Sequence, residues 1–204
     1  MNDDELDDEL EEPSPQETYA EIYAALDRAY ASGAHVWCRL SSSLEDYSGY
    51  VLGLSRALVY LRVIAGFEAD GFVVLALTDI SRVRSSRIER FFEGVLRAEG
   101  RLAQLPSAPA LELASIETLL ASLLAVDPYV GLSRGVLFCV GRLDRVDDGR
   151  LHISCIRVNG TAEARPREIE LAEITSVTFA SDYLTMFRRH GDWEPTEDDD
   201  EGDE

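Results

Sequence analysis

The chain has 204 residues, of which 46% are hydrophobic, and its formal net charge is -20. This length allows one or two domains, and the apolar content is sufficient for a packed core. No apolar run approaches the roughly 20 residues that a membrane-spanning helix requires, and the acidic start of the chain is opposite in charge to a secretory signal. Together with three widely spaced cysteines, these features predict a cytoplasmic protein with reduced thiols.

The acidic residues are concentrated at the two ends of the chain. Residues 1–17 hold nine acids and no base, and residues 191–204 also hold nine acids and no base. The part between them is close to neutral, with 21 acids and 19 bases. Acidic segments with few apolar residues cannot bury enough surface to offset their ordering entropy. Residues 1–13 and 191–204 are therefore predicted to be disordered tails.

The first predicted helix begins at a capping box from Ser14 to Glu17, with Pro15 at its first position. Gly33 ends the helix, and its apolar stripe comprises Tyr19, Ile22, Tyr23, Leu26 and Tyr30. Alternating or continuous apolar residues then predict five short strands at 34–40, 49–54, 58–64, 72–77 and 79–84. Asp70-Gly71 is predicted to form a tight turn between two of these strands.

A second capping box, Ser86 to Glu89, begins a helix that ends at Gly100. Its apolar stripe comprises Ile88, Phe91, Phe92, Val95 and Leu96. Residues 101–112 are predicted to be a linker, because they contain the sequence LPSAP. A third helix begins near Ser115, and five further strands are predicted at 129–132, 136–144, 151–158, 167–171 and 174–179. A short apolar and basic piece, 183–189, follows them.

The two sets of strands are predicted to be copies of one unit. Residues 49–64 align without a gap with residues 141–156, and the apolar positions coincide. Beyond the next turn, residues 77–83 align with residues 171–177 in the same way. The order of helix, strands and turns is also the same in both halves. The alternative is that any two β-meanders with similar turns would align like this.

A helix followed by five short strands resembles the Sm-like or SH3-like small barrel, in which closure removes exposed strand edges. The chain also resembles uncharacterised bacterial proteins that carry such barrels in tandem. The resemblance lies in residues 70–72, 79–80 and 90–92 of the first half, and in residues 174–179 and Tyr183 of the second half. The resemblance implies no established activity. The predicted fold is α+β and mainly β, with two tandem small barrels, each preceded by a helix, and a bridging helix at 86–100. The first unit covers residues 14–100 and the second covers residues 113–190.

Few residues of the chain suggest catalysis. His35, His152 and His190 have no acid or nucleophile at a spacing that indicates a catalytic dyad. Glycine patterns for phosphate binding are also missing from the sequence. An acidic group at 144–148 could attract a cation, although Asp148-Gly149 suits a hairpin turn better. The sequence therefore predicts a protein that is not an enzyme, with no cofactor and no metal site.

Arg82, Arg84, Arg87 and Arg90 cluster at the end of the first set of strands, and the last three of them are candidate binding residues. One interpretation is a site for a small anion or an acidic partner, assisted by the start of the following helix. Another is a solvated helix face, with Arg87 and Arg90 neutralised by Glu89 and Glu93. A third is that an acidic tail of the chain folds back onto these arginines.

The two tryptophans offer further candidates. Trp37 is included among the binding residues, although its place in an apolar run predicts a core position. Trp193 stands among acids and is either an anchor that docks on the folded part or on a partner, or a free residue of the tail.

These observations predict a non-catalytic cytoplasmic interaction or ligand-binding module, with a protein as partner and no membrane contact. One alternative is an RNA-associated Sm-like protein. Sm-like relatives carry a basic residue before the last strand, whereas Asp79 and Glu173 occupy those positions here, so nucleic acid is disfavoured. A second alternative is an acidic inhibitory or immunity protein that binds a basic partner. Strand pairing between copies would give a homo-oligomer, and the oligomeric state is left open.

Overall fold

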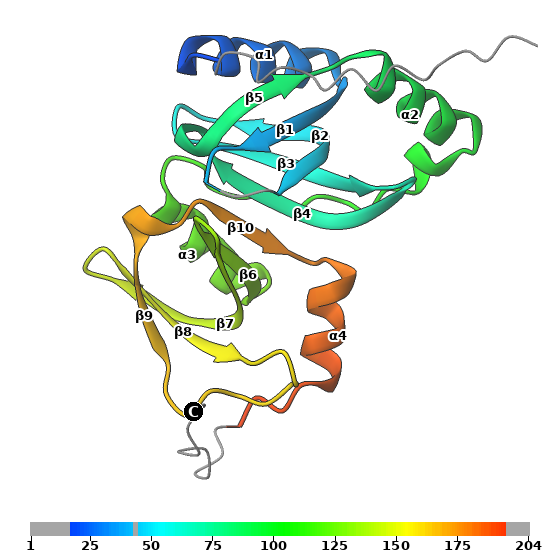
Figure 1. Cartoon of the computed structure of the whole chain (residues 1–204). Helices are drawn as coiled ribbons and strands as arrows, with labels where there is room; N and C mark the ends of the chain where they lie inside the picture. Colours follow the sequence, from blue (N-terminus) through cyan, green and yellow to red (C-terminus); the bar gives the residue numbers. More distant parts are fainter. Residues whose placement is uncertain (1–16, 43–44, 195–204) are drawn as a thin grey trace, which may run out of the picture.

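The computed structural model describes residues 17–42 and 45–194 (Figure 1). The predictions for residues 1–16 and 195–204, which include most of both acidic tails and the cap at Ser14, lie outside the described residues. Within the described ranges, no helix has the length and hydropathy needed to cross a bilayer.

The first half of the chain contains two helices, five strands and two short 3-10 turns. In chain order these are α1 Tyr19–Ser32, β1 His35–Leu40, β2 Asp46–Leu54, β3 Leu58–Ala65, β4 Glu68–Ala76, η1 Leu77–Asp79, β5 Ile80–Arg84, α2 Arg87–Ala98 and η2 Arg101–Gln104. The second half has the elements α3 Ile116–Val126, β6 Tyr129–Arg134, β7 Leu137–Asp147, β8 Arg150–Ile156, β9 Arg167–Glu170, η3 Leu171–Glu173, β10 Ser176–Phe179 and α4 Asp182–His190.

Local sequence signals determine most helix ends. Helix α1 begins one turn later than predicted, because Thr18 is the cap and forms a reciprocal capping box with Glu21. Gly33 ends this helix with a φ of 66°, as predicted. The capping boxes that begin at Ser86 and Ser115 are both present. The predicted end piece at 183–189 is a helix, α4, because Ser181 caps it.

All ten strands form one antiparallel sheet in the order β5-β1-β2-β3-β4-β10-β6-β7-β8-β9. Each half of this order is the same: the last strand of the half comes first and is followed by strands one to four. The halves join where residues 72–75 of β4 pair with residues 176–179 of β10 (Figure 1). The fold is therefore α+β and mainly β, as predicted. Two tandem small barrels are not confirmed, because the sheet is continuous across the halves and is not closed.

Two large hydrophobic cores lie on opposite faces of the central strands. The first core is formed by α1 and strands β1 to β5, and includes Leu26, Cys38 and Leu61. The second core is formed by α3 and strands β6 to β10, and also includes Tyr60 and Phe72 from β3 and β4. Strands β3 and β4 are therefore buried on both faces. The two halves therefore share a core layer, whereas two tandem barrels would each enclose a separate core.

The predicted tight turn at Asp70-Gly71 is also wrong. The turn between β3 and β4 lies at Gly66, whose φ is 61°, and both Asp70 and Gly71 lie inside β4. Gly71 has a φ of 69°, and a Cβ atom there would lie 2.5 Å from the backbone N of Ser181. The Asp70 carboxylate accepts a 2.9 Å hydrogen bond from the backbone N of Asp182, at the start of α4. These two residues are needed for a long-range contact and not for a local turn.

Helix α2 does not bridge the two halves. It packs against β1 and η2, at one end of the first half (Figure 1). On its inner side Phe92 stacks against Phe67, with the ring centroids 4.6 Å apart, and Leu96 is fully buried. Ile88 and Phe91, which were predicted to face the core, are 54% and 63% exposed.

Candidate functional site

The β1–β5 ladder brings two of the predicted binding residues together. Trp37 of β1 lies opposite Arg84 of β5, and the Arg84 guanidinium carbon is 4.1 Å from the centre of the indole ring. The guanidinium of Arg39 lies 4.8 Å from the same ring. Trp37 is half-buried on the face of the sheet opposite α1 and is not part of either large core, so its predicted core position is wrong. Cation–π contact fixes Arg84 over this ring.

Glu89 holds Arg84 from the other side. Its Oε1 accepts a 3.1 Å hydrogen bond from Arg84 Nε, and its Oε2 accepts a 2.6 Å bond from the backbone N of Ser86. Glu89 is only 2% exposed. Burial alone would raise the pKa of its carboxyl, but the hydrogen bonds from Ser86 and Arg84 bring that pKa below its usual value. Arg84 is therefore oriented by a charged, buried carboxylate.

Arg87 and Arg90 lie on the exposed face of α2. Their expected acidic neighbours are engaged elsewhere: Glu89 pairs with Arg84, and Glu93 pairs with Arg97 at 2.7 Å. Neither Arg87 nor Arg90 forms an ion pair with another residue that the structure describes. The two arginines therefore lie on a solvated helix face, as one interpretation expected, but they do not pair with Glu89 or Glu93.

A cavity of about 320 Å³ lies between α1 and the end of β5. Its polar lining comes from Arg28 and Ser32 of α1, together with Arg84 and Ser85. Like Arg82 on β5, Arg28 forms no ion pair within the described ranges. Sequence reasoning missed Arg28, because only the packing of α1 against β5 brings it near Arg84. We call the group Arg28, Arg82, Arg84, Arg87 and Arg90 the arginine surface.

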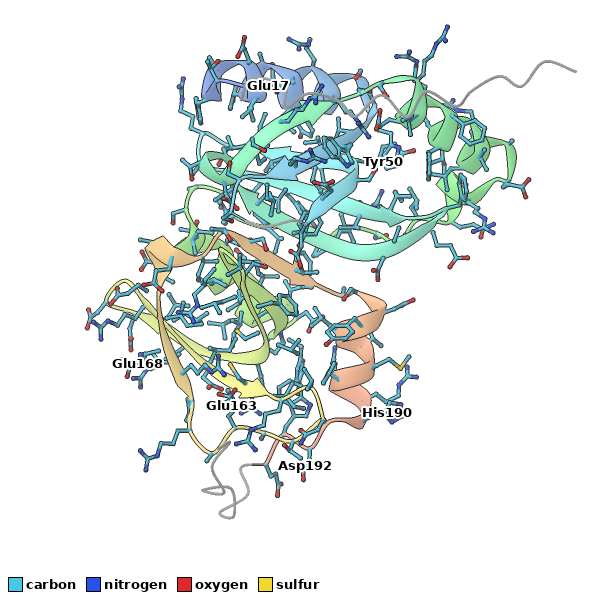
Figure 2. All side chains as sticks on the ribbon, in the orientation of Figure 1. Glu17, Tyr50, Glu163, Glu168, His190 and Asp192 are labelled. Carbon is cyan, nitrogen blue, oxygen red and sulfur yellow. The ribbon has the colours of Figure 1, made fainter. Side chains whose placement is uncertain are left out.

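The buried His35 supports this surface from beneath. Its Nδ1 lies 3.3 Å from the backbone O of Glu89, and its Nε2 lies 3.2 Å from Ser48 Oγ. Its ring stacks on that of Tyr50, 5.1 Å away, below α2 (Tyr50 is labelled in Figure 2). Burial lowers the pKa of the imidazole. His35 therefore fixes α2 on β1 as a neutral structural residue.

The acidic residues of the second half have structural partners. Asp148 and Gly149 form the β7–β8 turn with φ values of 47° and 77°, which matches a two-residue hairpin turn. Asp144 accepts a 2.7 Å hydrogen bond from Ser154 Oγ, and Asp147 lies 3.0 Å from His152 Nε2. No group of three or more His, Cys, Asp or Glu side chains among residues 17–42 and 45–194 is arranged to hold a metal ion.

Asp79 and Glu173, the two acids that were expected to repel nucleic acid, both have bonding partners within the chain. Asp79 is 7% exposed and accepts hydrogen bonds from the backbone N of Ser42 at 3.1 Å and from its Oγ at 2.6 Å. Glu173 pairs with Arg134 at 3.0 Å. Asp79 is therefore buried and hydrogen-bonded, and the charge of Glu173 is paired with Arg134.

Trp193 lies just beyond the boundary predicted at residue 190, and it is an anchor. Its Nε1 donates a 3.2 Å hydrogen bond to the backbone O of Phe187 in α4, and its ring packs edge-on to Tyr129 at 4.9 Å. It joins a small apolar cluster with Val140 and Leu184.

No family model, no curated protein and no solved structure matches this chain. The suspected likeness to tandem Sm-like proteins stays a prediction. The geometry of the arginine surface therefore carries the functional proposal.

Proposed function

We propose that the protein is a non-catalytic binding module that recognises an acidic ligand at the arginine surface. The supporting observation is that Arg84, whose orientation is fixed, shares a cavity with Arg28, which has no ion-pair partner in the described chain. Arg82 of β5 and Arg87 and Arg90 of the following helix are also without an ion pair there. Guanidinium groups bind carboxylates in planar, two-point geometry. Elsewhere, Arg97 and Arg134 have carboxylate partners, whereas Arg56, Arg165 and Arg189 form no ion pair in the described chain and serve as controls below.

An acidic polypeptide suits this surface better than a nucleic acid. Non-specific binding of single strands depends on aromatic rings that are free to stack with bases. Of the aromatic residues beside the surface, Trp37 is already packed against two guanidinium groups, and the exposed Phe91 of α2 contacts Phe92 edge-on. Carboxylates require only the arginines themselves. We also propose kinship with tandem Sm-like barrels, supported by the strand order that both halves share.

The test compares two triple variants of the full chain for binding of a fluorescent oligoglutamate peptide. Replacing Arg28, Arg87 and Arg90 with alanine should weaken binding roughly tenfold, because each exposed ion pair contributes up to about 1 kcal/mol. The control replaces three exposed arginines away from the surface: Arg56, Arg165 and Arg189. Equal losses in both variants would show that binding depends only on overall charge. An RNA oligonucleotide of the same charge that binds more tightly than the peptide would contradict the choice of a polypeptide.

A further inference from the structure

The two halves differ in what covers the outer edge of their last strand. In the second half, β10 pairs with β6 on one side and with β4 on the other. In the first half, β5 pairs with β1, and no other strand of the described chain pairs with it. Each of these strands follows a one-turn 3-10 helix. In η1, before β5, the N–H of Ile80 donates to the carbonyl of Leu77. In η3, before β10, the N–H of Ile174 donates to the carbonyl of Leu171. Ser81 is therefore equivalent to Thr175.

Glu17 occupies the edge of β5 where β4 occupies the edge of β10. The backbone N of Ala76 in β4 donates to Thr175 O at 2.9 Å, and the backbone N of Glu17 donates to Ser81 O at 3.2 Å. The Glu17 carboxylate then accepts a 3.1 Å hydrogen bond from the backbone N of Val83. A side-chain carboxylate thus takes the place of a strand carbonyl. Figure 2 labels Glu17 at this edge and Glu168 at the opposite edge of the sheet, on β9.

Among the residues that the structure describes, none pairs with β5 beyond Glu17 on this side. In an antiparallel strand the N–H and C=O of one residue point to the same side, so the Val83 carbonyl also faces away from β1. Val83, Arg84 and Ser85 line the 320 Å³ cavity, whose other wall includes the small residues Ala25 and Ala29 of α1. The small side chains of Ala25 and Ala29 leave space beside β5 for another backbone.

The sequence before Glu17 is unsuited to pair with this edge. In an antiparallel register that matches Glu17 with Ser81, Pro15 would stand opposite Val83 and Pro13 opposite Ser85. These are hydrogen-bonded positions, and proline has no N–H to donate. The residues directly before Glu17 are therefore excluded as the added strand.

We infer that the outer edge of β5 accepts an extended acidic peptide of a partner protein as an added antiparallel strand. When no ligand is bound, Glu17 forms hydrogen bonds with Ser81 and Val83 at this edge. The inference rests on the proposed function and specifies its ligand and binding mode. Main-chain hydrogen bonds to Val83 supply affinity. Because side chains alternate along a strand, carboxylates of the peptide reach Arg28 on one face, and Arg82 and Arg84 on the other.

The test uses a labelled nine-residue oligoglutamate peptide, whose carboxylates face both sides of an added strand. A second peptide of the same sequence carries N-methyl groups on alternate residues, which removes strand pairing but keeps the charge. Fluorescence anisotropy with the full chain should show that the unmodified peptide binds about tenfold more tightly or better. Replacement of Glu17 by alanine should strengthen binding of the unmodified peptide by about tenfold. Asp27→Ala is the matched control, because it removes one exposed acid from α1 without touching β5.

The outcomes separate the inference from the proposed function. If both peptides bind equally and the Arg28, Arg87 and Arg90 triple variant loses both, strand addition is wrong while the proposed function stands. If neither peptide binds, both proposals fail. Sedimentation velocity provides a further check on Glu17→Ala. Self-association of this variant without tighter peptide binding would show that the edge accepts a second copy, and would overturn the inference.

Discussion

Glu89 makes two interactions that one substitution removes, and both can be given a magnitude. In Glu89→Ala, the backbone N–H of Ser86 loses its acceptor at 2.6 Å, which costs about 1–2 kcal/mol for a partly buried donor. The ion pair with Arg84, whose side chain is 32% exposed, contributes a further 0.5–1 kcal/mol or so after allowance for solvent screening. We expect the free energy of unfolding to fall by about 2 kcal/mol in total.

Urea denaturation followed by tryptophan fluorescence measures this loss, and two variants make it specific. Glu93→Ala breaks the exposed pair with Arg97 and should cost less than about 0.5 kcal/mol. Glu89→Gln retains a capping side chain but not the charge, so it should lie between the two. The reasoning is refuted if Glu89→Ala is no less stable than Glu93→Ala.

The same variants test the pH dependence of this contribution. The folded-state pKa of Glu89 lies below its usual value, so the charged carboxylate stabilises the fold. This contribution is complete above the ordinary glutamate pKa of about 4.3 and is lost as the pH falls through the lower folded-state pKa. The stability difference between the native chain and Glu89→Gln should therefore shrink on acidification below that range. A difference that grew on acidification would contradict the assignment.

Three further predictions concern the rest of the chain. Gly71→Ala should lower the free energy of unfolding by at least about 2 kcal/mol, because Gly71 has a positive φ and a backbone atom would lie 2.5 Å from the added Cβ. Gly66→Ala is the control, at an open position with a similar φ, and it should cost less in the same urea titration. Trp193→Ala should cost about 2 kcal/mol, seen as a lower melting temperature, and unchanged melting would show that the anchor is not needed. Burial raises the pKa of the Cys38 thiol to about 12, so iodoacetamide at pH 8 should label Cys139 before Cys38. Mass spectrometry of peptides measures the order of labelling, and earlier labelling of Cys38 would contradict its burial.

The sequence predicted local structure well where local chemistry decides it. Ser86 and Ser115 cap helices as expected, Gly33 ends one, and strand positions agree within a few residues. Asp70-Gly71 misled the prediction because its backbone conformation serves a contact with residues 180–182, which are distant in the chain. Alternation also cannot show which sheet face a second layer covers, and for this reason the shared core was missed.

The candidate site was only partly predictable. The clustering of Arg84, Arg87 and Arg90 was visible because they are neighbours in the sequence. Arg28 joins them only through the packing of α1 on β5, and Glu17 reaches β5 across a long stretch of chain. Which arginines lack carboxylate partners also depends on side-chain geometry, since glutamate spacing along α2 suggested other pairs.

The burial of β3 and β4 on both faces affects how the chain can reach its native state during synthesis. Tyr60 and Phe72 pack against Phe179, near the far end of the sequence. A nascent chain that has completed only its first five strands therefore displays an uncovered aromatic layer until the last strand leaves the ribosome. A fragment cut at the linker would keep that layer permanently in water, and it would be prone to aggregate.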